Sequence, residues 1–136
     1  WTHAEVRPRQ TGKEAVSFMK KVLQMLKAMD IKVKRVLTDN GSCYKSKIFK
    51  KAVKSIGARS MYTRPYRPQT NGKAERFIQT LIREWSYGRS YMSSRQRNEK
   101  LPCYLKWYNV LRPHGSLNKQ PPISRLVVNN VPEIYI

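Results

Sequence analysis

The sequence contains few cysteines, few acids and no long apolar run. Its two cysteines, Cys43 and Cys103, lack CxxC spacing, which argues against both a disulfide framework and a structural zinc site. No apolar run approaches the roughly 18 residues that cross a bilayer, and no charged and apolar regions of a signal peptide follow Trp1. We therefore expect a cytoplasmic protein without a membrane partner.

Acids are the scarcer charged class, since 8 Asp and Glu stand against 28 Lys and Arg in 136 residues, a formal net charge of +20. A hydrophobic fraction of 40%, with three Trp and eight Tyr, is too high for a disordered basic tail. A folded chain this basic calls for a polyanionic partner. Because the basic residues are spread along the whole chain, and do not line one amphipathic helix, nucleic acid is favoured over an anionic membrane surface.

The hydrophobic periodicity predicts an α/β domain. The expected elements, in chain order, are a strand tail at 2–7, a helix at 12–29, a strand at 33–38, a helix from about 46 to 57, a strand at 59–63, a loop at 64–72, a helix from 73 and a last helix at about 101–111. Pro102 is expected in the first turn of that last helix or at a kink. We expect the strands at 33–38 and 59–63 to pair in parallel, with Asp39 at the carboxyl edge where such sheets bind ligands.

Most of the eight acids have a structural explanation. Glu14 belongs to a capping box that starts at Thr11, and Asp30 lies in a turn between a helix and a strand. Four others are expected to be ordinary solvent-exposed side chains: Glu5, Glu84, Glu99 and Glu133. Only Asp39 and Glu75 remain.

Asp39 and Glu75 are both expected beside basic loops at the same edge of the sheet. Each has a structural alternative, because Asp39 opens an Asp-Asn-Gly turn and Glu75 suits the first turn of a helix. As a pair of hard oxygen ligands next to a phosphate-binding surface, they are what Mg²⁺-assisted phosphodiester chemistry needs. One Asp and one Glu alone do not specify a metal site.

Three ordered segments carry a family resemblance: VLTDNG at 36–41, TRPYRPQTNGKAERF at 63–77 and YNVLRPH at 108–114. They closely resemble the integrase-type catalytic core of bacterial insertion-sequence transposases. These enzymes belong with retroviral integrases to the DDE class, which has a ribonuclease H-like fold. In that family the last two acids of the catalytic triad are commonly separated by 35 residues, and 35 residues lie between Asp39 and Glu75.

The resemblance implies a function in DNA integration. Asp39 and Glu75 would be the second and third triad members and ligands of one or two Mg²⁺ ions, with Mn²⁺ as a substitute. The family hydrolyses DNA at the ends of its element and joins the freed 3′-hydroxyl to target DNA, using one ion at the attacking oxygen and one at the leaving oxygen. The expected partners are transposon ends and target DNA in the bacterial nucleoid, together with further copies of the chain. The expected phosphate contacts are Arg64, Arg67, Lys73 and Arg76.

The resemblance also implies an N-terminally truncated core. The first Asp of the triad belongs to the first strand of the family fold, and this sequence is expected to begin at the third strand. Without the first two strands, the sheet would have a gap at its centre, beside the strand that ends at Asp39. We therefore expect residues 1–114 to form a partial integrase core, 115–136 to form a C-terminal extension, and this chain alone to be inactive in strand transfer. A non-catalytic DNA-binding remnant of a transposase remains the alternative.

Overall fold

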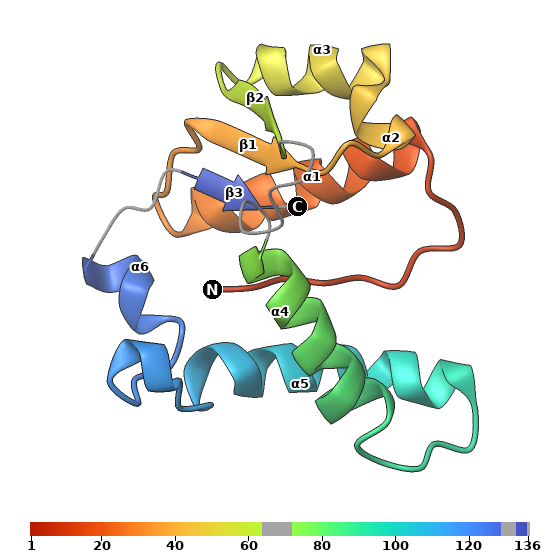
Figure 1. Ribbon diagram of the computed structural model, residues 1–136, viewed down its shortest axis with the longest axis vertical. Helices are drawn as coiled ribbons and strands as arrows, with labels where there is room; N and C mark the ends of the chain where they lie inside the picture. Colours follow the sequence, from red (N-terminus) through yellow and green to blue (C-terminus); the bar gives the residue numbers. More distant parts are fainter. Residues whose placement is uncertain (64–71, 129–132, 136) are drawn as a thin grey trace. The chain divides into compact units, whose positions relative to one another are not determined.

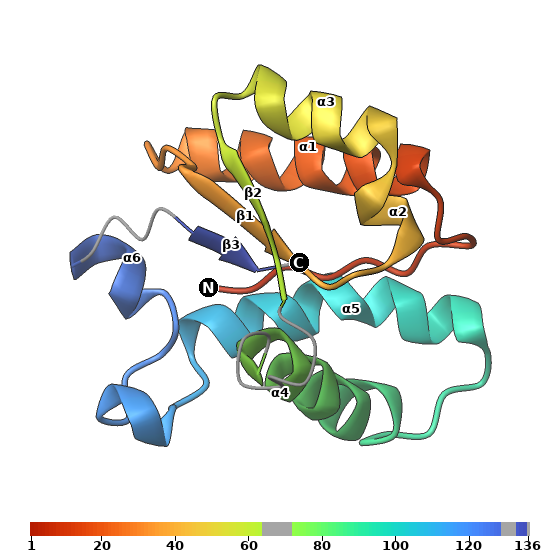
Figure 2. The same cartoon turned by 45° about the horizontal axis from the view of Figure 1, so that its top comes forward.

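The structure, a computed structural model, describes residues 1–63, 72–128 and 133–135 (Figures 1 and 2). The chain divides into two compact units, each described by itself below. The first unit comprises Trp1–Val6 and Arg76–Val131, and the second comprises Arg7–Glu75 and Pro132–Ile136. Among the helices of the described ranges, none is both long and apolar enough to span a membrane.

The second unit contains a small sheet and three helices. Its elements are α1 (Gly12–Ala28), β1 (Arg35–Thr38), α2 (Ser42–Lys45), α3 (Lys47–Ser55), β2 (Arg59–Tyr62) and β3 (Glu133–Tyr135). Local signals set the helix ends: Thr11 caps α1 by accepting a hydrogen bond from the backbone N–H of Glu14, and Ser46 caps α3 in the same way. Gly57, at a positive φ of 70°, follows α3. The two predicted longer helices are thereby confirmed, whereas the short α2 was not predicted.

The sheet has the order β2-β1-β3, with both pairings parallel. The predicted pairing of the strands at 33–38 and 59–63 is confirmed, with Arg35 opposite Arg59. The predicted gap beside the strand that ends at Asp39 is wrong, because β3 lies along that edge of β1 (Figure 2). With β3 in place, the backbone N–H and C=O groups of the central strand β1 have hydrogen-bonding partners on both sides, as a buried strand requires. The side chains of Met19, Val36 and Phe49 form the core of this unit and are at most 1% exposed.

The first unit is helical. Its elements are α4 (Gly72–Leu81, which crosses the boundary between the units), the π-helix η2 (Ile82–Ser86), α5 (Ser94–Val110), the 3-10 helix η3 (Gly115–Leu117) and α6 (Ser124–Val128). Trp85, Leu101 and Leu105 form the core, and Phe77 and Leu81 pack against it. The apolar spacing of the helix from 73 predicts a buried stripe of Ala74, Phe77, Ile78, Leu81, Ile82 and Trp85. The inward positions of Phe77, Leu81 and Trp85 are confirmed. Of the others, Ala74 is partly buried, and Ile78 and Ile82 are about half exposed.

The strand expected at 2–7 is wrong, and so is one of the two alternatives for Pro102, its place in the first turn of a helix. Residues 2–7 form no strand, because their extended backbone runs beside α5, where the Asn109 side chain replaces a neighbouring strand: Thr2 donates its N–H to Asn109 Oδ1 at 2.7 Å, and Asn109 Nδ2 donates to the Thr2 carbonyl at 2.8 Å. Pro102 lies inside α5 and not in its first turn, because Ser93 caps the helix well upstream of it by accepting from the Gln96 N–H.

Candidate active site

Asp39 directly follows β1, at the carboxyl end of the central strand, as predicted. Its side chain is exposed, and its Oδ1 accepts a hydrogen bond of 2.8 Å from the backbone N–H of Gly41. A Cβ at residue 41 would lie 2.9 Å from that oxygen, so glycine permits the close approach. A carboxylate offers roughly four lone-pair positions, so this bond orients Asp39 and leaves it able to accept further ligands.

Asn40 connects the carboxyl ends of β1 and β2. Its Nδ2 donates to the carbonyl of Thr63 at 2.8 Å, and the backbone N–H of Thr63 donates to the carbonyl of Thr38 at 2.9 Å. Thr38 is fully buried and ends β1. The Asp-Asn-Gly turn is therefore a connector between the two strand ends as well as the support of a carboxylate.

Glu75 lies in the first turn of α4, as predicted, with an exposed side chain. Negative charge is favourable there, because the backbone N–H groups of a helix start carry partial positive charge. Gln79 and Arg83 follow on the same exposed ridge, which confirms that this face points away from the core. Two of the four predicted DNA contacts, Lys73 and Arg76, lie on the same turn and are exposed.

The other two predicted DNA contacts, Arg64 and Arg67, lie outside the described residues. Asp39 and Glu75 both belong to the second unit, where Glu75 is the last residue before the boundary. Among the side chains of the described residues, no three or more His, Cys, Asp or Glu are grouped in a way that could hold a metal ion. A metal shared by Asp39 and Glu75 therefore stays a prediction.

Glu84 is not an ordinary solvated acid, contrary to the prediction. Its Oε2 accepts hydrogen bonds from Arg112 Nε at 3.0 Å and from the Tyr104 hydroxyl at 2.9 Å, and its Oε1 accepts from Arg112 Nη2. The Arg112 guanidinium holds the pKa of Glu84 below its ordinary value. Burial, and next the carboxylate of Glu84, raise the pKa of Tyr104. This network connects η2 with α5 and the residues after it.

One of the sequence motifs supplies several of the side-chain contacts within the helical unit. In the segment YNVLRPH at 108–114, Arg112 also lies over the ring of Tyr108 at 5.4 Å, and His114 packs edge-on against that ring at 4.9 Å between centroids. Burial, and next the positive charge of Arg112, lower the pKa of His114. Asn109, 6% exposed, anchors the N-terminal segment. This segment is a structural hub of the first unit.

Glu5 was also predicted to be solvent-exposed, and this is wrong. Its Oε1 lies 3.1 Å from His3 Nε2, and both side chains are about 15% exposed. Glu99 is different, because its carboxylate pairs with Arg95 one turn away while both side chains stay mostly exposed. The capping box explains Glu14 only in part. Its backbone N–H donates to the Thr11 side chain, as in a capping box, but its carboxylate pairs with Arg7.

Comparison with known proteins identifies a matching family model and similar proteins. The family model for the integrase core domain matches residues 56–122, a range that includes Glu75 and the segment at 108–114 but not Asp39. The transposase InsD for insertion element IS2A/D/F/H/I/K of Escherichia coli is 29% identical over 86 residues, which are 63% of this chain and 29% of that protein. An InsD protein of insertion element IS2E of the same species matches over 39% of its length, at the same identity.

Solved structures share the fold. The catalytic core domain of BIV integrase has a TM-score of 0.68 at 19% identity, covering 93% of this chain and 77% of that one. A chain in the simian T-cell lymphotropic virus intasome, in complex with a PP2A regulatory subunit, has a TM-score of 0.65 at 24% identity, covering 88% of this chain and 41% of that one. Together these matches support an integrase-type transposase core. The fold predicted from sequence, a ribonuclease H-like integrase core, is confirmed.

Within the integrase-type core, the residues divide by role. Asp39 and Glu75 stand exposed at a strand end and a helix start, whereas Glu84, Arg112 and Asn109 hold the helical unit together. The chain spans well under half the length of the curated relatives that it matches. The sequence offered one signal for the second group, namely the position of Arg112 and Asn109 within a motif of the family resemblance.

Proposed function

We propose that this chain is the part of a transposase core that carries two catalytic carboxylates, Asp39 and Glu75, and acts in DNA end cleavage and strand transfer. One observation supports the proposal most directly: within an integrase-type fold, Asp39 directly follows the central strand and Glu75 lies in the first turn of a helix, with 35 residues between them. Strand ends and helix starts are rigid, so they hold catalytic groups better than loop tips do.

The chemistry of the two carboxylates suits Mg²⁺ or Mn²⁺. Both ions prefer oxygen ligands, and both side chains are exposed, so phosphate oxygens could complete the coordination. Asp39 and Glu75 would hold the metal, which when bound would activate an attacking oxygen and stabilise a leaving oxygen. The Gly41 N–H orients Asp39 before any ligand arrives, and Glu75 lies in the first turn of α4, which fixes its backbone.

Four cations near Glu75 would place DNA over the carboxylates. Lys73 and Arg76 are exposed on the same helical turn, and Arg64 and Arg67 precede it in the sequence. Arg presents a planar fork to phosphate oxygens, whereas Lys acts as a point charge. We propose further that the chain works in the cytoplasm at the nucleoid, as one of several copies joined on DNA, and that residues 1–114 form the core while 115–136 extend it.

A second candidate is a non-catalytic DNA-binding remnant of a transposase. The hydrogen bond from Gly41 to Asp39 favours it, because an Asp-Asn-Gly turn explains this carboxylate without any metal. In that case the net charge of +20 would be the whole basis of DNA binding.

The two candidates predict opposite signs in a single binding assay. We would measure the affinity of the chain for a fluorescent duplex by anisotropy at constant ionic strength, with Mg²⁺ or with EDTA. A catalytic core should bind more tightly with Mg²⁺, and Asp39→Asn with Glu75→Gln should abolish that gain. In a remnant, the same substitutions remove repulsion between carboxylates and phosphates, so they should tighten binding under both conditions.

The control is the pair Asp30→Asn with Glu99→Gln. It removes the same two charges from exposed side chains that neither candidate function assigns to DNA or metal. If the control pair also abolished the Mg²⁺ gain, or if the wild-type chain showed no gain, the catalytic proposal would be contradicted.

A further inference from the structure

The helices α1 and α3 carry lysines on the faces that point away from the core. In α1 the buried positions are Val16, Met19, Val22 and Leu26, and in α3 they are Phe49 and Val53. The exposed lysines on the other sides form what we call the lysine face: Lys13 and Lys20 of α1, and Lys47, Lys50, Lys51 and Lys54 of α3.

The two helices lie next to each other in the second unit (Figures 1 and 2). Gly12 shows how close the approach is, because a Cβ there would lie 2.4 Å from Ser46 Oγ and 2.9 Å from Ile48 Cγ2. A larger residue at position 12 would require the side chains of Ser46 and Ile48, or the backbone that carries them, to move.

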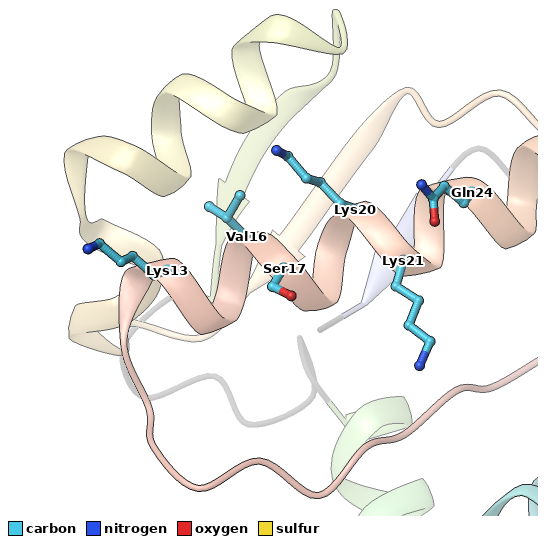
Figure 3. A pocket seen from close by; sticks show the side chains of 6 residues that line it. All are labelled: Lys13, Val16, Ser17, Lys20, Lys21 and Gln24. Atoms are coloured by element: carbon cyan, nitrogen blue, oxygen red, sulfur yellow. The ribbon is translucent and has the colours of Figure 1, made fainter.

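Lys13 and Lys20 border an open hollow of about 510 Å³ on α1, which Val16, Ser17, Lys21 and Gln24 also line. Figure 3 shows both lysines extending on the side of α1 nearer to α3, while Lys21 points away from that side. Seven residues of helix rise about 10 Å, which sets the spacing of the two lysines along the axis. The Ser17 hydroxyl and the Gln24 amide are donors of the kind that contact phosphate oxygens between charged groups.

The charge of this region is unbalanced. Residues 7–63 contain 15 Lys and Arg and 3 Asp and Glu, a net of +12. The one acid of α1, Glu14, pairs with Arg7, and α2 and α3 contain no acid. In α3 the lysines stand three and four residues apart, a spacing at which like charges destabilise a helix. An external polyanion would relieve this repulsion.

The kind of cation indicates how the polyanion would be bound. The three helices α1, α2 and α3 contain lysine and no arginine, whereas three of the four cations proposed near Glu75 are arginines. Lysine contacts phosphate as a hydrated point charge and does not form the forked contact by which arginine reads guanine. Binding by the lysine face should therefore depend on backbone charge and not on base sequence.

We propose that the lysine face binds the phosphate backbone of duplex DNA without sequence preference, as a second DNA contact separate from Asp39 and Glu75. This goes beyond the proposed function, because it requires neither carboxylate nor any metal. The lysine face would bind a DNA segment that is not being cleaved or joined.

The test is the salt dependence of duplex binding in EDTA, measured by anisotropy with a fluorescent duplex of arbitrary sequence. The variant carries Lys13→Gln, Lys20→Gln, Lys50→Gln and Lys54→Gln. Because each phosphate contact contributes about 0.9 to the slope of log affinity against log salt, we expect the slope to fall by about two to four. Arginine at the same four positions should restore the slope.

A matched control removes the same charge from the first unit, through Arg89→Gln, Lys100→Gln, Lys106→Gln and Arg125→Gln, all at exposed positions. We expect it to change the slope by less than about one. Equal losses in both variants would show that only net charge matters and would overturn the proposal, as would an unchanged slope in the lysine variant. Stronger binding of the wild-type chain to single-stranded RNA or anionic phospholipid vesicles than to the duplex, lost in the lysine variant, would also overturn it.

Folding is checked by circular dichroism, and if the fourfold variant unfolds, the two pairs on α1 and α3 are tested separately. The outcome is independent of the catalytic proposal. Asp39→Asn with Glu75→Gln should leave the slope in EDTA unreduced, whether or not those residues bind metal.

Discussion

Removing the charge of Glu84 should destabilise the helical unit far more than removing the charge of an exposed glutamate. Glu84 accepts three hydrogen bonds, two of them from the Arg112 guanidinium, and the two side chains are only 30% and 26% exposed. Hydrogen bonds to charged groups contribute roughly 1.5–3 kcal/mol each. Because Gln keeps the shape and part of the bonding, and because water still reaches the pair, we expect Glu84→Gln to cost about 2 kcal/mol.

The matched control is Glu99→Gln, which breaks the exposed pair with Arg95 one turn away. Such pairs contribute about 0.3–0.5 kcal/mol. The assay is thermal unfolding followed by tryptophan fluorescence, because Trp1, Trp85 and Trp107 all belong to the first unit. For a unit of this size, 2 kcal/mol lowers the midpoint by roughly 10 °C. Equal shifts for the two variants would refute the reasoning.

The same pair has a pH signature. Since Arg112 lowers the pKa of Glu84 below its ordinary value of 4.5, the added stability is fully present above that pH and is lost as the pH falls through the folded pKa. The difference between wild type and Glu84→Gln should therefore be constant near neutral pH and shrink below about pH 4.5. A difference that grew on acidification would contradict the assignment.

Three further predictions concern the two units. Burial and Arg112 lower the pKa of His114, so stability should fall as the pH drops below 6.5, and His114→Asn should flatten that part of the pH profile in fluorescence melts. Asn109→Ala removes the buried amide that holds Thr2, so it should cost about 1–3 kcal/mol and speed tryptic cleavage at the exposed Arg9, as followed by mass spectrometry. Phe49→Ala empties a fully buried site in the second unit and should cost about 3–5 kcal/mol by circular dichroism in urea; a loss below about 1 kcal/mol would place Phe49 outside the core.

The elements set by neighbouring residues could be predicted from the sequence. Thr11 and Ser46 cap helices by bonding an N–H three residues on, and Gly57 follows α3 in a conformation that favours glycine. The place of Asp39 at a strand end followed from the short β-branched run and the turn after it. In the same way, polar residues recur at every fourth position, Glu75, Gln79 and Arg83, and this spacing indicates the exposed side of a helix.

Features that depend on distant partners could not be predicted from local patterns. β3 is only three residues long and pairs with a strand almost a hundred residues earlier. The residues around Glu133 therefore carry no local pattern that predicts a strand. The extended segment at 2–7 looks like a strand because an extended backbone has the same residue preferences, yet its partner is the Asn109 side chain. Glu84 meets Arg112 28 residues away, a contact that hydrophobic periodicity does not report.

The proposed function requires Asp39 and Glu75 to bind a divalent metal on DNA, and this can be measured as Mn²⁺ binding. The measurement is the loss of the free Mn²⁺ resonance in electron paramagnetic spectra when the chain is added to a duplex. Our account predicts bound Mn²⁺ in the wild type, retained with Asp30→Asn and strongly reduced with either Asp39→Asn or Glu75→Gln. Equal Mn²⁺ binding in the wild type and in all three variants would contradict it.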